Sequence, residues 1–380
     1  MSWTRSYRRY ELRQQGIDEV IVQGQAECPK DVGTLIVSNH SFHYDSYVLI
    51  EAGLQRGWCS HFMTAWQVFG MASPLQRRLL QSHGCFSINR EGMDTSAFRQ
   101  AISILQESPH PLVLFPEGDI YHSNDRVMPF RDGAGAIPLS ASKRSVRPIY
   151  VQPCAMKCFY TVDTMPQLLD MMSRLEAHIR WRPRPELPLV ERIYRFGDGF
   201  LSLKEVEYTG HACSGSVRDR IQQLAQQILE QVRVKHGIEQ QGKDITDQIK
   251  NVRAKLIRKI EGLYEDKSGD QKLISDEHAQ EYEQLQIAMD DVFFVTQLSS
   301  YHGNYTVEKP TIERIAETID KFEEDVFGLQ APTPRGRRRA IVRFGAPIEV
   351  QAGSTTSGEL SSLLEKEVQS LLDQINADHD

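Results

Sequence analysis

Short apolar runs alternate with polar turns through the first 160 residues. Four of these runs are typical of strands, because they span only a few residues and end at turn residues: Val20–Val22, Leu35–Val37, Leu112–Phe115 and Val146–Val151. Pro148 lacks a backbone N–H, and it restricts the last run to a sheet edge or a bulge. Between two of the runs, Thr95–Leu105 repeats its apolar residues with helical spacing. Strands that alternate with helices predict an α/β domain with a central sheet flanked by helices.

The later part of the chain follows a helical pattern. Apolar residues recur every three or four positions over residues 217–232, 245–263, 312–326 and 360–375. The first three stripes predict helices that pack against one another. We therefore expect a helical insertion over residues 161–337, followed by a closing strand and a C-terminal helix over residues 338–380.

Residues 58–80 are unusually apolar and aromatic, and they contain Arg77 and Arg78 near their end. Phe62, Trp66 and Phe69 share helical spacing, which favours a helix packed into the core. The alternative is an exposed apolar surface, because such surfaces mark membrane or ligand contacts.

Residues 1–18 form a basic, aromatic N-terminal arm, in which Tyr7 and Tyr10 alternate with Arg8, Arg9 and Arg13. Aromatic and arginine side chains mixed in this way suit the headgroup layer of an anionic membrane. A helix that packs on the domain through its aromatic face explains the same pattern equally well.

Charge and cysteine usage narrow the class of protein. The net charge is −7, with a balance of +2 over residues 1–160 and −9 over the remaining residues, so we expect no nucleic-acid partner. The six cysteines form no C-x-x-C pair and no zinc spacing with histidine; we expect no metal ligands and a reducing compartment, the cytoplasm. No apolar run approaches the ~20 residues that span a bilayer, so we expect neither a membrane-spanning helix nor a signal peptide.

The strand at Leu35–Val37 leads into Asn39-His40-Ser41-Phe42-His43-Tyr44-Asp45, and a new apolar run follows. A helix would point His40 and Asp45 roughly 140° apart, so they can meet only across a loop that leads into a helix. A carboxylate on one imidazole nitrogen fixes the tautomer, and the other nitrogen can then act as a general base. The chain contains no G-x-S-x-G nucleophile motif, so the proton would come from a substrate hydroxyl. The alternative is structural, with Asp45 as an ordinary helix N-cap.

A second strand, Leu112–Phe115, leads into Pro116-Glu117-Gly118. Sheets of this class bind ligands at the carboxyl ends of their strands. Gly118 lets backbone N–H groups approach a ligand, and Glu117 can orient a hydroxyl group. Arg90 ends another short strand, and its planar guanidinium suits a phosphate.

Four blocks therefore follow one another in order: Asn39-His40 with Asp45, Gly84 to Arg90, Phe115-Pro116-Glu117-Gly118, and Arg147-Pro148-Ile149-Tyr150-Val151. They resemble the four motifs of the phospholipid/glycerol acyltransferase family, which includes glycerol-3-phosphate and lysophosphatidic acid acyltransferases. Arg343 to Ile348 resembles the strand that closes the same domain. The resemblance implies a mixed sheet with an acyltransferase core over residues 19–160.

The resemblance also implies roles for these residues. His40 would be the general base and Asp45 its support, in a His-x4-Asp motif. Arg90 would bind the acceptor's phosphate, Glu117 and Gly118 would shape the acceptor site, and Asn39, Phe115 and Pro116 would support it. The hydroxyl of glycerol 3-phosphate or a lysophospholipid would attack an acyl-CoA or acyl-carrier-protein thioester at a membrane surface, with no acyl-enzyme and no cofactor. The insertion would complete the fold, cover an acyl channel or form a dimer contact.

The third block departs from the family pattern. Many members continue Gly-Thr-Arg-Ser, whereas this chain has Gly118-Asp119-Ile120-Tyr121, with a carboxylate close to where a cation is common. Arg126 or Arg131 are candidate substitutes. A non-phosphorylated acceptor, a thioesterase and a catalytically silent lipid-binding protein are therefore the alternatives. His43 lies two residues before Asp45, the wrong offset for the motif.

Overall fold

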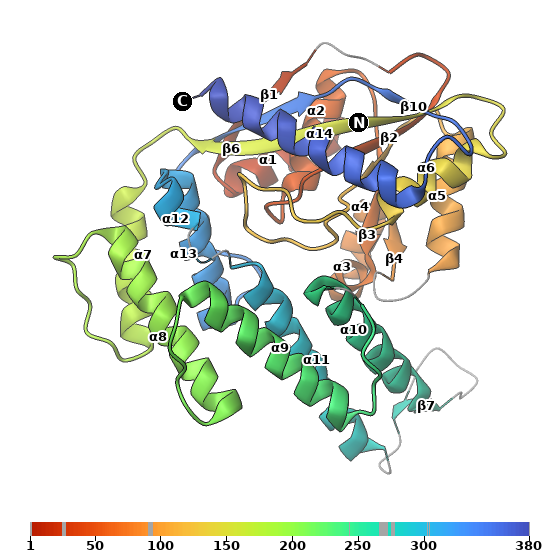
Figure 1. The fold of residues 1–380 in the computed structure, drawn as a ribbon. Helices are drawn as coiled ribbons and strands as arrows, with labels where there is room; N and C mark the ends of the chain where they lie inside the picture. Colours follow the sequence, from red (N-terminus) through yellow and green to blue (C-terminus); the bar gives the residue numbers. More distant parts are fainter. Residues whose placement is uncertain are drawn as a thin grey trace. The chain divides into compact units, whose positions relative to one another are not determined.

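The computed structural model describes residues 2–24, 28–89, 94–242, 244–265, 273–274, 278–301, 303 and 305–379. The chain forms two compact units, one of residues 1–186 and 310–380 and the other of residues 187–309 (Figure 1). The first unit includes α7 (Met165–His178) and α13 (Ile312–Phe327), two helices that fall within the predicted insertion.

The first unit is built on one mixed sheet of eight strands. The order is β1 (Ile17–Gln23), β9 (Arg338–Phe344), β6 (Ile149–Tyr160), β2 (Gly33–Ser38), β5 (Leu112–Leu114), β3 (His61–Ala65) and β4 (Cys85–Ile88), and β10 (Ile348–Val350) pairs with β6. β2 is parallel to both β5 and β6, whereas β6 is antiparallel to β9 and β10. The predicted mixed α/β fold is confirmed.

Helices cover both faces of this sheet. Alternation in β2 sends Leu35 and Val37 to one core and Ile36 to the other. The first core contains residues of α5 (Thr95–Glu107), α6 (Gly133–Ser142) and α14 (Ser357–Ala377). The second contains residues of α1 (Ser2–Gln14) and α2 (Asp45–Gln55). Both faces of β2 and β5 are therefore buried in a three-layer unit.

The prediction that Pro148 confines its strand to an edge or a bulge is wrong, because β6 is an interior strand. Pro148 lies one residue before β6 begins, so its missing N–H removes no ladder hydrogen bond. Its carbonyl accepts a hydrogen bond from the backbone N–H of Gly33 at 2.9 Å.

The expectation of a core helix around residues 58–80 is also wrong. Phe62 lies in β3 and is buried, whereas Trp66 and Phe69 lie in the short helix α3 (Trp66–Met71). Trp66 is 48% exposed, and Met71 and Leu75 are 64% and 67% exposed. Leu75 belongs to α4 (Pro74–Ser82), so two short helices present an apolar surface.

The N-terminal arm packs on the domain through α1. Arg8 donates from Nε and Nη2 to Oε2 of Glu51 in α2 at 3.0 and 2.7 Å, and both side chains are buried. Leu12 enters the core beside α2. Arg9 and Tyr10 remain exposed.

The second unit is a bundle of helices with its own core. Its long helices, in the described residues, are α8 (Leu189–Thr209), α9 (Val217–Lys235), α10 (Ile245–Gly262) and α11 (Ala279–Ser299). The two-residue strands β7 (Tyr264–Glu265) and β8 (Leu273–Ile274) lie between α10 and α11, and the short α12 (Tyr305–Glu308) follows α11. The predicted stripes of α9 and α10 form this core together with residues of α11. Arg220 of α9 donates from Nε and Nη2 to Glu205 of α8 at 2.9 and 2.8 Å, a bidentate pair that lowers the pKa of Glu205 against the opposing effect of burial.

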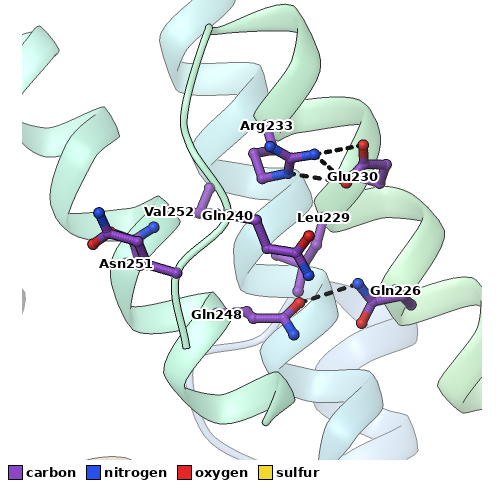
Figure 2. Close-up of a pocket in the computed structure, with 9 residues that line it drawn as sticks. Gln226, Leu229, Glu230, Arg233, Gln240, Gln248, Asn251 and Val252 are labelled. Carbon is purple, nitrogen blue, oxygen red and sulfur yellow. Dashed lines mark hydrogen bonds and ion pairs between the residues drawn. The ribbon is translucent and has the colours of Figure 1, made fainter. Parts of the chain in front are cut away.

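Figure 2 shows a small pocket within this bundle, lined by side chains of α9, α10 and the segment between them. Its volume is about 10 Å³, at the lower limit for holding a single water molecule. The lining is mostly glutamine and asparagine, with the ion pair between Arg233 and Glu230. Such a pocket has no room for a substrate.

Candidate active site

The loop between β2 and α2 brings His40 and Asp45 together. His40 lies two residues after β2, and Asp45 is the first residue of α2. His40 Nδ1 and Asp45 Oδ2 are 3.0 Å apart. The five-residue offset thus closes across a loop that leads into a helix, as the spacing predicts.

Asp45 is not the N-cap of α2, which is Tyr44. Instead, its Oδ2 accepts hydrogen bonds from the backbone N–H groups of Ser41 and Phe42 at 2.7 and 2.9 Å. The carboxylate is buried and lies at the positive end of the helix dipole. These contacts hold one oxygen atom in position to orient the imidazole.

An aromatic residue packs against the face of the His40 ring. Phe115 stacks on it with ring centroids 4.3 Å apart and an angle of 19° between the planes. The side chain is 19% exposed, so a substrate can reach it. Among the described residues, no hydrogen bond engages Nε2, the nitrogen on the opposite side of the ring from Asp45.

Glu117 links the third sequence block to the first. Its Oε1 accepts the backbone N–H of His40 at 2.9 Å. Burial raises the pKa of Glu117 well above its ordinary value, and the charges of Asp45 and Glu365 raise it further, while backbone hydrogen bonds from His40 and Met128 oppose the shift. Glu117 therefore supports the His40 loop from within the protein.

Gly118 has a left-handed backbone (φ +77°), and a Cβ there would collide with the guanidinium of Arg131. Arg131 Nη2 is 3.5 Å from the carbonyl oxygen of Gly118. Its backbone N–H donates to the Pro116 carbonyl at 2.9 Å. The structure thus sets a cation directly beside the block in which Asp119-Ile120 stands where many family members have Thr-Arg.

Asn39 holds the end of β2 against β6. Its Nδ2 donates to the Met156 carbonyl at 2.9 Å, and its Oδ1 accepts the Met156 N–H at 2.8 Å. The side chain is fully buried. This pair of bonds fixes where the His40 loop leaves the sheet.

Arg90, the predicted phosphate ligand, lies outside the described residues. Asp119 Oδ1 is 3.3 Å from the backbone N–H of Ile120. Arg126 is partly buried in the loop that follows.

Sequence reasoning missed the part that the C-terminal helix contributes. Side chains of α14 accept hydrogen bonds from backbone N–H groups of the loop after Gly118: Glu365 from Phe130 at 2.8 Å and Gln369 from Val127 at 2.9 Å. Ser361 accepts one from Gly135, in the first turn of α6, at 3.0 Å. Polar residues on an otherwise amphipathic helix give no sign of this role. They order the loop that contains Arg131.

His43 lies in the same loop as His40 but belongs to a different cluster. Its Nε2 is 3.2 Å from Oε1 of Glu324 in α13, and Nε2 of His122 is 2.8 Å from Oε2 of Glu324. Burial raises the pKa of Glu324, but the hydrogen bonds and charges of the two imidazoles lower it to about 2. Among the described residues, these three side chains lie close enough to share a metal ion.

No helix in the described part of the chain is both long and apolar enough to cross a membrane. A comparison with curated proteins finds no match. Residues 19–157 match the family model described as Acyltransferase. This range includes His40, Asp45, Glu117 and Gly118. The chain therefore has, over residues 19–157, the domain of the glycerol-3-phosphate/lysophosphatidic acid acyltransferase family, and the protein is an acyltransferase.

Proposed function

We propose that the protein transfers a fatty acyl group from an acyl-CoA or acyl-carrier-protein thioester to a hydroxyl of glycerol 3-phosphate or of a lysophospholipid such as lysophosphatidic acid. The observation that carries this proposal is the 3.0 Å contact between His40 Nδ1 and Asp45 Oδ2. The His40 side chain nevertheless remains accessible to solvent. A base held in this way needs only a hydroxyl to deprotonate.

In this mechanism, Nε2 of His40 takes the proton of the acceptor hydroxyl as its oxygen attacks the thioester carbonyl carbon. The C–S bond then breaks, and the departing thiolate receives the proton from the imidazolium. Asp45 stabilises the transient imidazolium by its charge. The acyl group passes directly to the acceptor, so no acyl-enzyme forms and no cofactor is required.

We assign the phosphate of the acceptor to a positively charged site beside Gly118. Arg131 lies against Gly118, and its guanidinium can bind two phosphate oxygens at once. Arg90 is a second proposed ligand on the basis of its motif. Arg131 thereby supplies the positive charge that the sequence Asp119-Ile120 lacks.

We further propose peripheral membrane association in the cytoplasm. The exposed side chains of Trp66, Met71 and Leu75 form an apolar surface next to the exposed Arg77 and Arg78. Apolar contact combined with basic charge suits an anionic bilayer surface. The acceptor and the acyl product are themselves membrane lipids in the lysophospholipid case.

Release of free thiol tests this function, with palmitoyl-CoA and an acyl-carrier-protein thioester as donors. The acceptors are glycerol 3-phosphate, lysophosphatidic acid, a monoacylglycerol and none. We expect thiol release that requires a phosphorylated acceptor and yields the acylated lipid. Release that requires only monoacylglycerol would favour the non-phosphorylated acceptor, and release without any acceptor would identify a thioesterase. No release at all would favour a silent lipid-binding protein.

A further inference from the structure

Three segments that are distant in the sequence meet at one cluster of metal-ligating side chains. His43 comes from the loop between β2 and α2, His122 from the loop after Gly118, and Glu324 from α13. The donor atoms of the three side chains all lie within 4.8 Å of one another. All three residues belong to the first unit.

The donor atoms lie close enough to one another to share a metal ion. Each histidine directs Nε2 at a different oxygen of the same carboxylate, at 3.2 Å for His43 and 2.8 Å for His122. Ligands at 2.0–2.2 Å from a tetrahedral zinc ion lie about 3.3 Å from one another. The two imidazole-to-carboxylate separations are close to that value.

The surroundings of the cluster also suit a bound ion. The His122 side chain is 3% exposed, and Phe42 packs edge-on against it with ring centroids 6.2 Å apart. His122 has a left-handed backbone (φ 47°), uncommon for a residue with a side chain. The His43 side chain is 39% exposed, which gives an ion and a coordinating water access from solvent.

We propose that His43, His122 and Glu324 bind a divalent transition-metal ion of the zinc class, which fixes α13 to the two loops that surround the active site. Two imidazoles and one carboxylate suit zinc, whereas magnesium and calcium prefer oxygen ligands alone. Three protein ligands leave a fourth position for water. The role assigned to the ion is structural, and the proposal does not depend on the acceptor or the donor of the acyl transfer.

Metal titration of the purified, chelator-treated full chain tests this site. We expect calorimetry to show one zinc ion bound per chain, and cobalt(II) to give the visible d–d absorption of a nitrogen- and oxygen-ligated site. Glu324→Gln removes the anionic ligand with little change of shape, and it should weaken binding by at least about 100-fold and abolish the absorption. Absence of stoichiometric binding, or equal affinity of the Glu324→Gln variant, would overturn the proposal.

A matched control comes from a second pair of histidines. His61 and His110 have ring centroids 6.3 Å apart, and His110 is exposed. His110→Gln therefore removes a histidine without touching the cluster, and it should bind zinc as the wild type does. If His110→Gln loses zinc instead, the ion binds at that pair and the proposal fails.

Thermal unfolding with and without zinc tests the site through an exposed ligand, so the result does not depend on a substitution in the core. His43→Gln changes the most exposed ligand and is expected to fold normally, as circular dichroism can verify. Zinc should raise the Tm of the wild type, because an ion that binds only the folded state stabilises it. The Tm of His43→Gln should not rise. An equal rise in both proteins would show that zinc binds elsewhere and would contradict the site.

Discussion

The backbone N–H of His40 donates to Oε1 of Glu117 at 2.9 Å. This bond joins the loop after β2 to the loop after β5, two adjacent parallel strands. Glu117 therefore holds the loop of the proposed base from a fully buried position, where a charged carboxylate is costly.

Burial of Glu117 predicts a characteristic pH dependence of stability. Its pKa is raised in the folded state above the ordinary value of 4.5, so the folded state binds the extra proton. The stabilisation from this group is complete below pH 4.5 and is lost as the pH rises toward the folded-state pKa. Glu117→Gln keeps an acceptor for His40 and carries no charge. Above pH 4.5, the free energy of unfolding of Glu117→Gln should increase relative to that of the wild type as the pH rises, by up to about 1.4 kcal/mol per pH unit.

Urea unfolding of the two proteins between pH 4 and 8 measures this difference. Glu107 serves as the control position, because its side chain is exposed on α5. Glu107→Gln should show no comparable trend with pH. A constant difference between Glu117→Gln and the wild type, or one of the opposite sign, would contradict the raised pKa of Glu117.

Much of the first unit is predictable because local pattern and tertiary structure agree there. The run at Leu35–Val37 lies in β2, and the first three residues of the run at Leu112–Phe115 form β5; both stretches are buried. The His40–Asp45 offset closes across the predicted loop. These features depend on residues near one another in the sequence. The stripes of α9, α10, α13 and α14 are likewise helices.

The remaining features depend on contacts between distant residues. Phe62 and Trp66 share helical spacing, but pairing with β4 and β5 makes the segment around Phe62 a strand. Nothing local connects Glu324 with His43 and His122, or α14 with the loop that contains Arg131. Tertiary packing decides such contacts, and periodicity does not encode them.

Arg131 should determine affinity for a phosphorylated acceptor. We expect Arg131→Gln to raise the KM for glycerol 3-phosphate or lysophosphatidic acid by about tenfold or more, since a charge-assisted hydrogen bond contributes about 1.5–3 kcal/mol. The KM for the thioester should change little. Arg131→Lys keeps the charge and should recover part of the loss. Equal increases in both KM values would indicate that Arg131 only supports the loop around Gly118.

The buried pair of Arg8 and Glu51 should make α1 part of the folded domain. Arg8→Met leaves the Glu51 carboxylate buried, with the exposed Arg9 at 3.6 Å from it. The change should lower the free energy of unfolding by about 3–5 kcal/mol. The double variant Arg8→Met/Glu51→Met should recover much of this loss. Arg9→Met, at an exposed position, should cost less than about 1 kcal/mol. Urea unfolding measures these free energies. Equal losses for Arg8→Met and Arg9→Met would contradict the packing of α1 on the domain.

The exposed surface of α3 and α4 should contribute to membrane binding. Trp66→Gln/Leu75→Gln removes two large apolar side chains, each expected to contribute about 1.5–3 kcal/mol when buried in lipid. Sedimentation with anionic vesicles should fall by about tenfold or more. Leu363→Gln is the control, because Leu363 is 43% exposed on α14. Unchanged sedimentation of the double variant would exclude this surface as the membrane contact.

The most direct test of the mechanism is the turnover number of His40→Ala. We expect acceptor-dependent thiol release to fall by about 10²–10⁴-fold, the contribution of a positioned general base. The exposed His110→Ala should keep wild-type turnover, and circular dichroism should confirm that both variants fold. Full activity of His40→Ala would contradict the assignment of the base and the mechanism that depends on it.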